Sequence, residues 1–571
     1  MNPLPNLHAE LVEQAIRAAQ NAGDLPEFDL PEISINRPKK AEQGDYACPV
    51  ALALAKPVGR KPLEIAEAIV RHLPPADFVA SAGVAPPGFI NFRLSESWLR
   101  DQIEMIIAAG TGYATLDQGA NKRAQVEFVS ANPTGPLHVG RSRGAIVGDA
   151  IARVLEAAGF DVEREYYFNN AGVQMRNLGE SLRIRYLQAL GRPVETPAED
   201  EASFYQGEYL IDYARDLCDE RGDSLADADW QPFKEYAEKR MFENIRATLS
   251  RVDIQHDQFF NENSLFESGA IWDVLQKLDD AGYIYSSAVR ESEDEEVKAQ
   301  NKDLPPAKWF RSSQLGDMED RVLVKSDGAP TYTLPDIAYH KDKLDRGFDL
   351  LVNVLGADHF VQHQVVKYGV RALDMDASKI HVILVQMVRT VRDGKEVKIS
   401  TRRGVYETLD DLIDQTSADA VRYMLLARNP NSQMDFDMDL AVRQSNDNPV
   451  YYIQYAHVRC AGIFREAEAR DVSDEGADLS LLDTEALDFV RKALELPEMI
   501  AFATDNMAPH AIAHYALDLA NQFHPMYDRV RVFGEGVDPD LARARLRFYR
   551  AAMVAFRSAL DLMGMSAPER M

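Results

Sequence analysis

The spacing of apolar residues changes between positions 125 and 158 from that of a strand to that of a helix. The stretch begins with a short apolar run and continues through a loop rich in Pro, Gly and Asn. In the remainder, apolar residues recur at intervals of three and four, which places them on one helix face. These residues are Ile146, Val147, Ala150, Ile151, Val154, Leu155 and Ala158. The pattern predicts a strand, a loop and a long amphipathic helix.

Changes of the same kind divide the chain into three parts. Residues 1–112 combine helical segments with one extended run at 88–95. Residues 113–445 alternate strands with helices, as in a doubly wound sheet, and carry a polar helical insertion at 192–260. Residues 446–571 contain amphipathic helices, which predict a bundle. We expect an α/β core of Rossmann type with insertions, a small α+β N-terminal domain and an all-α C-terminal bundle.

Within the central part, several runs indicate how the sheet is built. Residues 321–334 form two extended runs around a Ser-Asp-Gly turn at 326–328, which predicts a hairpin. Residues 349–355 and 379–388 predict strands, and the residues between them include a helical pattern at 361–375. Two βα halves around an insertion fit a split nucleotide-binding sheet, although periodicity leaves the strand order open.

The composition is that of an ordinary globular protein, with 46% hydrophobic and 27% charged residues. A chain of 571 residues is too long for one hydrophobic core. No apolar run approaches the roughly 18–20 residues of a membrane span, and the N-terminus lacks the apolar segment of a signal peptide. Cys48, Cys218 and Cys460 lie far apart without the spacing of metal ligands. We expect a cytoplasmic protein with no structural zinc, no dedicated metal site and no membrane partner.

The net charge of −28 weighs against binding to nucleic acid, for which a basic surface is usual. Acidic runs at 199–201 and 291–296 have the character of solvated loops. Arginines gather near the C-terminus, at Arg543, Arg545, Arg547 and Arg550. Any contact with RNA would depend on such local basic patches.

The predicted helix after the Pro-rich loop begins at a group of residues suited to bind an anion. Unpaired backbone N–H groups and the helix dipole both point at such a loop. Gly140 allows a ligand to approach the backbone, while His138, Arg141 and Arg143 supply donors for phosphate. This arrangement suits a nucleoside triphosphate. A histidine that only caps a helix is the alternative.

The sequence EFVSANPTGPLHVG, at residues 127–140, resembles the HIGH signature of class I aminoacyl-tRNA synthetases. It is similar, more narrowly, to the form found in bacterial arginyl-tRNA synthetases. The resemblance extends to GDYACPVALALAK at residues 44–56, to SADAVRYMLL at residues 417–426 and to the ending SAPERM. It implies an N-terminal module that contacts the tRNA elbow, a class I catalytic domain and a C-terminal anticodon-binding domain.

The resemblance implies an enzyme that joins arginine to tRNA(Arg) at the expense of ATP, with Mg²⁺ on the ATP phosphates. The KMSKS segment of class I enzymes corresponds to residues 398–402, in which Lys398 and Ser400 match. Thr401 replaces the second lysine of KMSKS, and Arg141 replaces the second histidine of HIGH. Arg141, Arg402 or Arg403 could supply the missing positive charge, and the sequence does not choose among them. The expected catalytic residues are His138, Gly140, Arg141, Lys398 and Ser400.

An arginine substrate needs carboxylates for its guanidinium and polar groups for its amino and carboxyl ends. Glu127 and Asp336 are the candidates for the guanidinium. By resemblance to the family, the arginine site consists of Glu127, Ser130, Asn132, Tyr332, Asp336 and Gln362. Each also has a structural explanation, such as Asn132 in a turn or Asp336 in the first turn of a helix.

The resemblance also places Gly356 and Asp358 at the ribose and adenine of ATP. A glycine permits close approach and a carboxylate binds ribose hydroxyls, although Asp358 could equally cap the next helix. The expected ATP-binding residues are His138, Gly140, Gly356, Asp358, Lys398 and Arg402.

The C-terminal helices offer both charge and aromatic rings to an RNA. The candidate tRNA contacts are Arg459, Arg543, Arg547 and Arg550. Tyr451, Tyr452 and Tyr455 could stack on unpaired bases, or they could be core residues of a helix junction. A dimerisation role for the bundle is the alternative to RNA binding, and the family suggests a monomer.

Two other functions compete with this interpretation. A small-molecule adenylyltransferase shares the His-x-Gly-His logic but has no use for the N-terminal module or the C-terminal bundle. A non-catalytic RNA-binding paralogue would explain the altered Arg141 and Thr401, whereas the complete arginine site argues against it.

Overall fold

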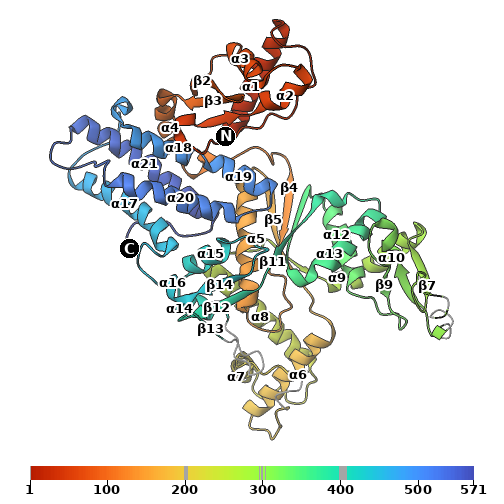
Figure 1. Ribbon diagram of the computed structural model, residues 1–571. Coiled ribbons are helices and arrows are strands. Elements are labelled where there is room, and N and C mark those ends of the chain that lie inside the picture. Colours follow the sequence, from red (N-terminus) through yellow and green to blue (C-terminus); the bar gives the residue numbers. More distant parts are fainter. Residues whose placement is uncertain (1, 198–203, 295, 297–299, 302–303, 398–407) are drawn as a thin grey trace.

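The computed structural model describes residues 2–197, 204–294, 296, 300–301, 304–397 and 408–571. A central α/β core carries two insertions, and the N-terminal part and a helical bundle lie together on its other side (Figure 1). The doubly wound core, the small α+β part and the all-α bundle expected from the sequence are confirmed.

The N-terminal part is a three-stranded antiparallel sheet covered by helices. The sheet has the order β1-β3-β2, from Tyr46–Cys48, Phe89–Leu94 and Val79–Ala85. The helices are α1 (Leu4–Asn21), α2 (Val50–Val58) and α3 (Pro62–Arg71). Helix α4 (Glu96–Ala109) follows and packs against the C-terminal bundle.

The core sheet consists of five parallel strands in the order β11-β10-β4-β5-β6. Their bounds are Ile380–Val385, Leu350–Gly356, Arg123–Glu127, Asp161–Phe168 and Gln258–Asn261. Helix α5 (Val139–Ala157) links β4 to β5, and α13 (Phe360–Ala372) links β10 to β11. From β4 the chain adds strands β5 and β6 on one side, whereas β10 and β11 lie on the other side. The point between β4 and β10 is therefore a topological switch point, where a crevice forms at the carboxyl ends of the strands.

The first insertion is helical, as its polar sequence predicts. It contains α6 (Gly172–Ala189), α7 (Tyr209–Arg221) and α8 (Gln231–Arg251), and it separates β5 from β6. The second insertion follows β6 and has a hydrophobic core of its own. Its elements are α9 (Asn263–Glu267), α10 (Ala270–Asp280), β7 (Ile284–Ser287), β8 (Ala307–Phe310), β9 (Arg321–Val324) and α12 (Thr333–Asp345).

The predicted hairpin is confirmed but shorter than expected, and the predicted strand at 379–388 is wrong in its extent. The turn at 326–328 forms, but the returning run pairs only through an isolated bridge between Val324 and Pro330, and α12 begins at Thr333. Pro335 lies in the first turn of that helix, where a proline costs no hydrogen bond. The run 379–388 is not one strand, because the chain leaves the main sheet after β11.

After this break the chain forms a small sheet beside the core. Strand β12 (Val388–Arg392) pairs with β13 (Lys395–Glu396) and with β14 (Met434–Asp437). Helices α14 (Leu409–Gln415) and α15 (Ala418–Leu426) lie between β13 and β14, and α16 (Met438–Ala441) leads from β14 to the bundle.

The C-terminal bundle consists of five helices within the described residues. They are α17 (Pro449–Ala469), α18 (Thr484–Ala493), α19 (Leu496–Asp505), α20 (His510–Tyr527) and α21 (Pro539–Leu562). In that same described part of the chain, no helix combines the length and the apolar character required to cross a membrane.

A buried ion-pair cluster ties α5 to the end of the bundle. Asp149 on α5 and Arg422 on α15 each retain only 1% of their side-chain exposure, and they form an ion pair. Arg422 also donates to the carbonyl oxygens of Met563 and Val252, and Arg153 donates to Asp149 at 2.7 Å. Burial acts to raise the pKa of Asp149, but Arg422 and Arg153 outweigh it and hold that pKa below its usual value. We call this cluster the α5 lock.

Candidate active site

The switch point of the sheet brings together the loop after β4 and the start of α5. His138 is the N-cap of α5, and its Nδ1 accepts a hydrogen bond from the backbone N–H of Gly140 at 2.8 Å. A Cβ at position 140 would lie 2.9 Å from that nitrogen, so the glycine makes room for the cap. Burial and the nearby Arg141 lower the pKa of His138. The neutral ring therefore carries its proton on Nε2, which can donate to an anion.

The two arginines of this helix start have different environments. Arg141 is exposed at the first turn of α5, where a guanidinium can meet a phosphate. Arg143 is fully buried, and its guanidinium donates to the carbonyl oxygens of Gln386, Ser432 and Asn429 at 3.3, 2.6 and 2.8 Å. The expectation that Arg143 offers donors to a phosphate is therefore wrong. Burial without a carboxylate partner lowers its pKa to about 10.

The segment that resembles KMSKS lies outside the described residues, which include neither Lys398, Ser400, Thr401, Arg402 nor Arg403. The described residues directly after it lie beside the helix start. Thr408 pairs with His138 through an antiparallel bridge, and the N–H of Leu409 donates to the carbonyl of Leu137 at 2.8 Å. The Thr408 side chain begins α14 with a capping box. The chain thus returns beside His138 directly after this segment.

Glu127, at the carboxyl end of β4, is nearly buried and has both oxygens engaged. Its Oε2 accepts a hydrogen bond from the ammonium of Lys343 at 2.6 Å, and its Oε1 accepts one from the Ser130 hydroxyl at 3.0 Å. The Ser130 hydroxyl oxygen in turn accepts a bond from the N–H of Tyr167 at 3.2 Å. Ser130 therefore connects Glu127 to the neighbouring strand β5.

The backbone beside Glu127 is strained. Val129 and Ser130 have φ angles of 69° and 40°, in the left-handed region that β-branched residues rarely adopt. Strain of this kind persists where the surrounding structure demands it, and it is common in binding sites. Here it turns the Ser130 hydroxyl back onto Glu127.

Asp336 lies in the first turn of α12 and accepts a hydrogen bond from the side-chain amide of Gln362. Burial raises the pKa of Asp336 to about 7; the Gln362 bond and Lys343 oppose this rise, while Glu262 and Glu127 add to it. Two further carboxylates, which follow or end β6 and β4, thus act on Asp336. We call Glu127, Glu262 and Asp336 the carboxylate pocket.

Glu262 is the member of this pocket that the sequence analysis missed. It follows β6 directly and accepts hydrogen bonds from the Tyr167 hydroxyl at 2.7 Å and from the Asn169 amide at 2.8 Å. Burial raises its pKa as well. An acidic residue after a parallel strand was the available signal. Strand β6 has only four residues and follows a long polar insertion, so it does not stand out in the sequence.

The remaining expected arginine-site residues surround the carboxylate pocket. Asn132 is exposed in the loop after β4, where its side chain joins the backbone N–H of Asn169 to the side chain of Gln174, at 3.0 and 2.9 Å. Tyr332 is 82% exposed at the start of α12, one turn before Asp336. Both side chains are therefore at the surface, beside the carboxylate pocket.

Gly356 is the last residue of β10 and Asp358 follows it, across the switch point from His138. A Cβ at position 356 would fall 2.5 Å from the Asp358 carboxylate, which is exposed. The Asp358 side chain is exposed and forms a long ion pair with His359 at 3.6 Å. Across the described ranges, no group of three or more His, Cys, Asp or Glu side chains has an arrangement that could hold a metal ion.

The C-terminal arginines expected to contact RNA already have intramolecular partners. Arg459 lies between the rings of Tyr455 and Tyr527, at 4.8 and 4.6 Å from their centroids. Arg547 pairs with Glu104 of α4, and Arg543 donates to loop carbonyl oxygens at residues 473 and 475.

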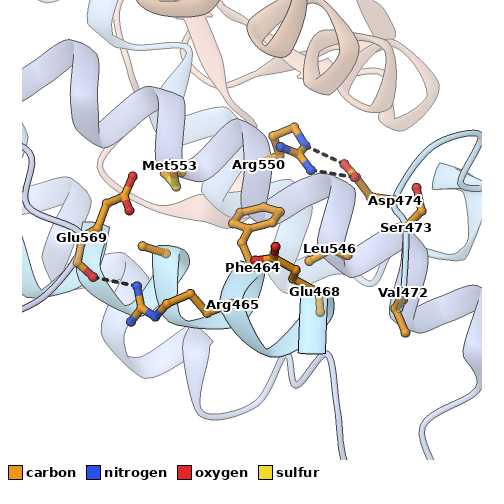
Figure 2. Close-up of a pocket in the computed structure, with 12 residues that line it drawn as sticks. Phe464, Arg465, Glu468, Val472, Ser473, Asp474, Leu546, Arg550, Met553 and Glu569 are labelled. Carbon is orange, nitrogen blue, oxygen red and sulfur yellow. Dashed lines mark hydrogen bonds and ion pairs between the residues drawn. The ribbon is translucent and has the colours of Figure 1, made fainter. Parts of the chain in front are cut away.

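Arg550 borders a cavity of about 490 Å³ between α17 and α21 (Figure 2). Its guanidinium makes two hydrogen bonds of 2.7 Å to Asp474 and lies over the ring of Phe464. Arg465 on the opposite rim donates to the carbonyl oxygen of Glu569 at 2.8 Å. Arg543 and Arg550 nevertheless keep 39% and 42% of their side chains exposed, more than Arg459 and Arg547.

Three family models match consecutive parts of the chain. The arginyl tRNA synthetase N terminal domain matches residues 6–94, and the catalytic domain of class I (R) tRNA synthetases matches residues 102–457. The DALR anticodon binding domain matches residues 453–571. The matches together extend over nearly the whole chain.

Individual proteins agree with these models. The chain is 40% identical to the arginine–tRNA ligase of Desulfotalea psychrophila, over 98% of this chain and 99% of that protein. It is also 40% identical to the arginine–tRNA ligase of Oceanobacillus iheyensis, over the full length of both. The structure of Thermus thermophilus arginyl-tRNA synthetase superposes over the full length of both chains with a TM-score of 0.75. At 21% identity, that likeness shows a shared fold.

Proposed function

The chain belongs to the arginyl-tRNA synthetase family, and on this premise we propose that it activates arginine with ATP and transfers the arginyl group to tRNA(Arg). The products are arginyl-tRNA, AMP and pyrophosphate. One observation supports this function most directly. The anion-binding start of α5 and the carboxylate pocket meet at the same switch point of the sheet.

Activation is an in-line attack of the arginine carboxylate on the α-phosphorus of ATP, with pyrophosphate as the leaving group. The protein has to align the two substrates and stabilise negative charge. In this proposal the start of α5 with His138, Gly140 and Arg141 binds phosphate, and Lys398, Ser400 and Arg402 bind it as well. Mg²⁺ on the phosphates shares this task.

Arginine enters with its guanidinium toward the carboxylate pocket. Glu127 and Asp336 bind the guanidinium, and Glu262 adds a third carboxylate to the site. Each oxygen of Glu127 and of Glu262 already accepts one hydrogen bond, and a carboxylate oxygen can accept a second. Asn132, Tyr332 and Gln362 complete the site around the backbone of the substrate, and Gly356 and Asp358 bind the ribose and adenine of ATP.

The division of labour along the chain follows the expected boundaries of 1–112, 113–445 and 446–571. The N-terminal part contacts the tRNA elbow, and the bundle contacts the anticodon stem. Arg459 between Tyr455 and Tyr527 offers a stacking surface, and Arg543, Arg547 and Arg550 offer charge. The enzyme is a cytoplasmic monomer in this proposal.

Arginine-dependent exchange between ATP and labelled pyrophosphate, in the presence of tRNA, tests the activity. His138→Ala and Lys398→Ala should each lower kcat by about 10²–10³-fold, because each removes a group that stabilises developing charge. Affinity for tRNA should remain unchanged. Exchange that is equally fast without arginine would support a small-molecule adenylyltransferase, and the absence of exchange would support a non-catalytic RNA-binding protein.

A further inference from the structure

Lys343 occupies an unusual position behind the carboxylate pocket. It lies on α12, two turns after Asp336, and its side chain is completely buried. Its ammonium donates to Glu127 at 2.6 Å and to the side-chain oxygen of Asn353 at 2.9 Å, and it lies 4.1 Å from the centre of the Tyr339 ring. A lysine is rarely buried unless it is paired, so these contacts specify its place.

Other titratable groups lie near Lys343: Arg346, on the same helix, pairs with Glu165, which also accepts a hydrogen bond from Tyr339. His340 and His363 lie nearby, but burial lowers the pKa of each to about 3, so both rings are neutral at physiological pH. Of the groups that act most strongly on Asp336, Lys343 is the only cation, against the carboxylates Glu262 and Glu127. The described part of the pocket therefore holds three carboxylates and one ammonium.

The contacts of Lys343 also determine the direction of Glu127. The ammonium holds one carboxylate oxygen and Ser130 holds the other, so Glu127 cannot rotate toward the guanidinium without losing a bond. The strained turn at Val129 and Ser130 places the Ser130 hydroxyl for the second of these bonds. Because Glu127 already has a fixed orientation before the substrate arrives, substrate binding loses less conformational entropy.

We propose that Lys343 is a positioning residue of the arginine pocket, whose buried ammonium orients Glu127 and supplies the counter-charge that three neighbouring carboxylates require before the substrate binds. The inference rests on the proposed function. It differs from a purely structural role, because Lys343 then controls how readily Asp336 ionises. Without the ammonium, Glu127 and Glu262 would oppose that ionisation more strongly.

Arginine KM, ATP KM and kcat of the full-length enzyme are measured by pyrophosphate exchange with tRNA, between pH 6 and pH 9. The variants are Lys343→Met and, as a matched control on the same helix, Lys341→Met, since Lys341 forms an outer pair with Asp345. Lys343→Met should raise arginine KM about tenfold or more at pH 7, because Asp336 then stays protonated to higher pH and Glu127 loses the bond that orients it. The pH at which arginine KM begins to rise should move upward, and ATP KM should stay within about twofold.

A structural role alone would lower stability or kcat without moving the pH profile of arginine KM. A folded Lys343→Met enzyme with wild-type arginine KM and pH profile would overturn the inference. If that variant does not fold, Glu127→Gln with Lys343→Met removes both charges, and a wild-type arginine KM in this double variant would overturn it as well. Lys341→Met should match the wild type. Wild-type exchange that does not depend on arginine would refute the proposed function instead.

Discussion

The α5 lock and the carboxylate pocket are both buried charge clusters, but their charges are balanced in opposite ways. In the lock, the single carboxylate of Asp149 faces Arg422 and Arg153 at hydrogen-bond distance. In the pocket, Lys343 pairs with Glu127 and acts on Asp336, near which Glu262 adds a third carboxylate. Arg422 and Arg153 lower the pKa of Asp149 in spite of its burial, whereas burial raises the pKa of Asp336 to about 7, and Glu262 and Glu127 add to this rise.

This difference separates a cluster that stabilises the fold from one that waits for a substrate. A buried charge is costly unless it is paired and hydrogen-bonded, and the lock meets that condition. The pocket leaves negative charge in excess, which costs stability in the free enzyme and is relieved when a guanidinium binds. Sites that bind ligands commonly give up stability in this way.

Breaking the lock should have the largest effect. Arg422→Met leaves Asp149 buried without one partner, and it leaves the carbonyl oxygens of Met563 and Val252 without their donor. Removal of one member of a buried pair typically costs about 3–5 kcal/mol. Urea unfolding monitored by circular dichroism measures this loss. Arg389→Met, which breaks an exposed pair with Asp435, is the control. A loss below about 1 kcal/mol for Arg422→Met would show that the lock does not stabilise the fold.

Removing charge from the pocket should affect binding and spare stability. Asp336→Asn should lower kcat/KM for arginine by about 10–100-fold, because a charge-assisted contact is worth roughly 1.5–3 kcal/mol. The same variant should be at least as stable as the wild type at pH 8, since the folded-state pKa of about 7 lies above that of an unfolded aspartate, and ionisation therefore opposes folding. Thermal unfolding measures the stability and pyrophosphate exchange measures kcat/KM, both on the same preparation. Lower stability at pH 8 would place Asp336 with Asp149 as a structural carboxylate.

The pH dependence should distinguish the two clusters without any mutation. The arginine guanidinium favours ionised Asp336, so the dissociation constant of arginine should rise about tenfold for each pH unit below 7 and level off above it. Calorimetric titrations between pH 5.5 and 8.5 measure this, and Asp336→Asn should abolish the dependence. Asp149 has a lowered pKa, so its contribution to stability is present above the unfolded pKa and is lost only as the pH falls through acid values. A flat arginine affinity across this range would contradict the charge excess.

The sequence predicted the pocket only in part, and for a physical reason. His138, Glu127 and Asp336 belong to local patterns, a helix start, a strand end and a first helical turn, each of which a short stretch determines. Glu262 and Lys343 reach the pocket from elements that the tertiary fold brings there; Glu262 follows a strand of only four residues, and Lys343 lies within a helix.

The arginines show the same limit. Arg141 and Arg143 both follow the signature histidine closely, and from the sequence alone either could donate to a phosphate. The helix turns one of them toward solvent and the other into the interior, where it is fully buried and bonds only to backbone carbonyl oxygens. The regular elements of the core were predictable because hydrophobic periodicity determines them, whereas the break after β11 depends on pairing with β14, some fifty residues later along the chain.

The pair between Arg547 and Glu104 should show the smallest effect, because it belongs to neither kind of cluster. It joins α21 to α4 at the surface, and the side chain of Glu104 remains half exposed. Exposed pairs contribute about 0.2–1 kcal/mol, and salt weakens them. Glu104→Gln should therefore change the free energy of unfolding by less than about 1 kcal/mol, and the change should shrink in 0.5 M salt. Filter binding of tRNA adds a second readout, since Glu104→Gln removes one of the two carboxylates that pair with Arg547, the other being Asp474, and should tighten binding slightly. A loss of stability comparable to that of Arg422→Met would mean that domain contact, rather than burial, determines which ion pairs hold this fold together.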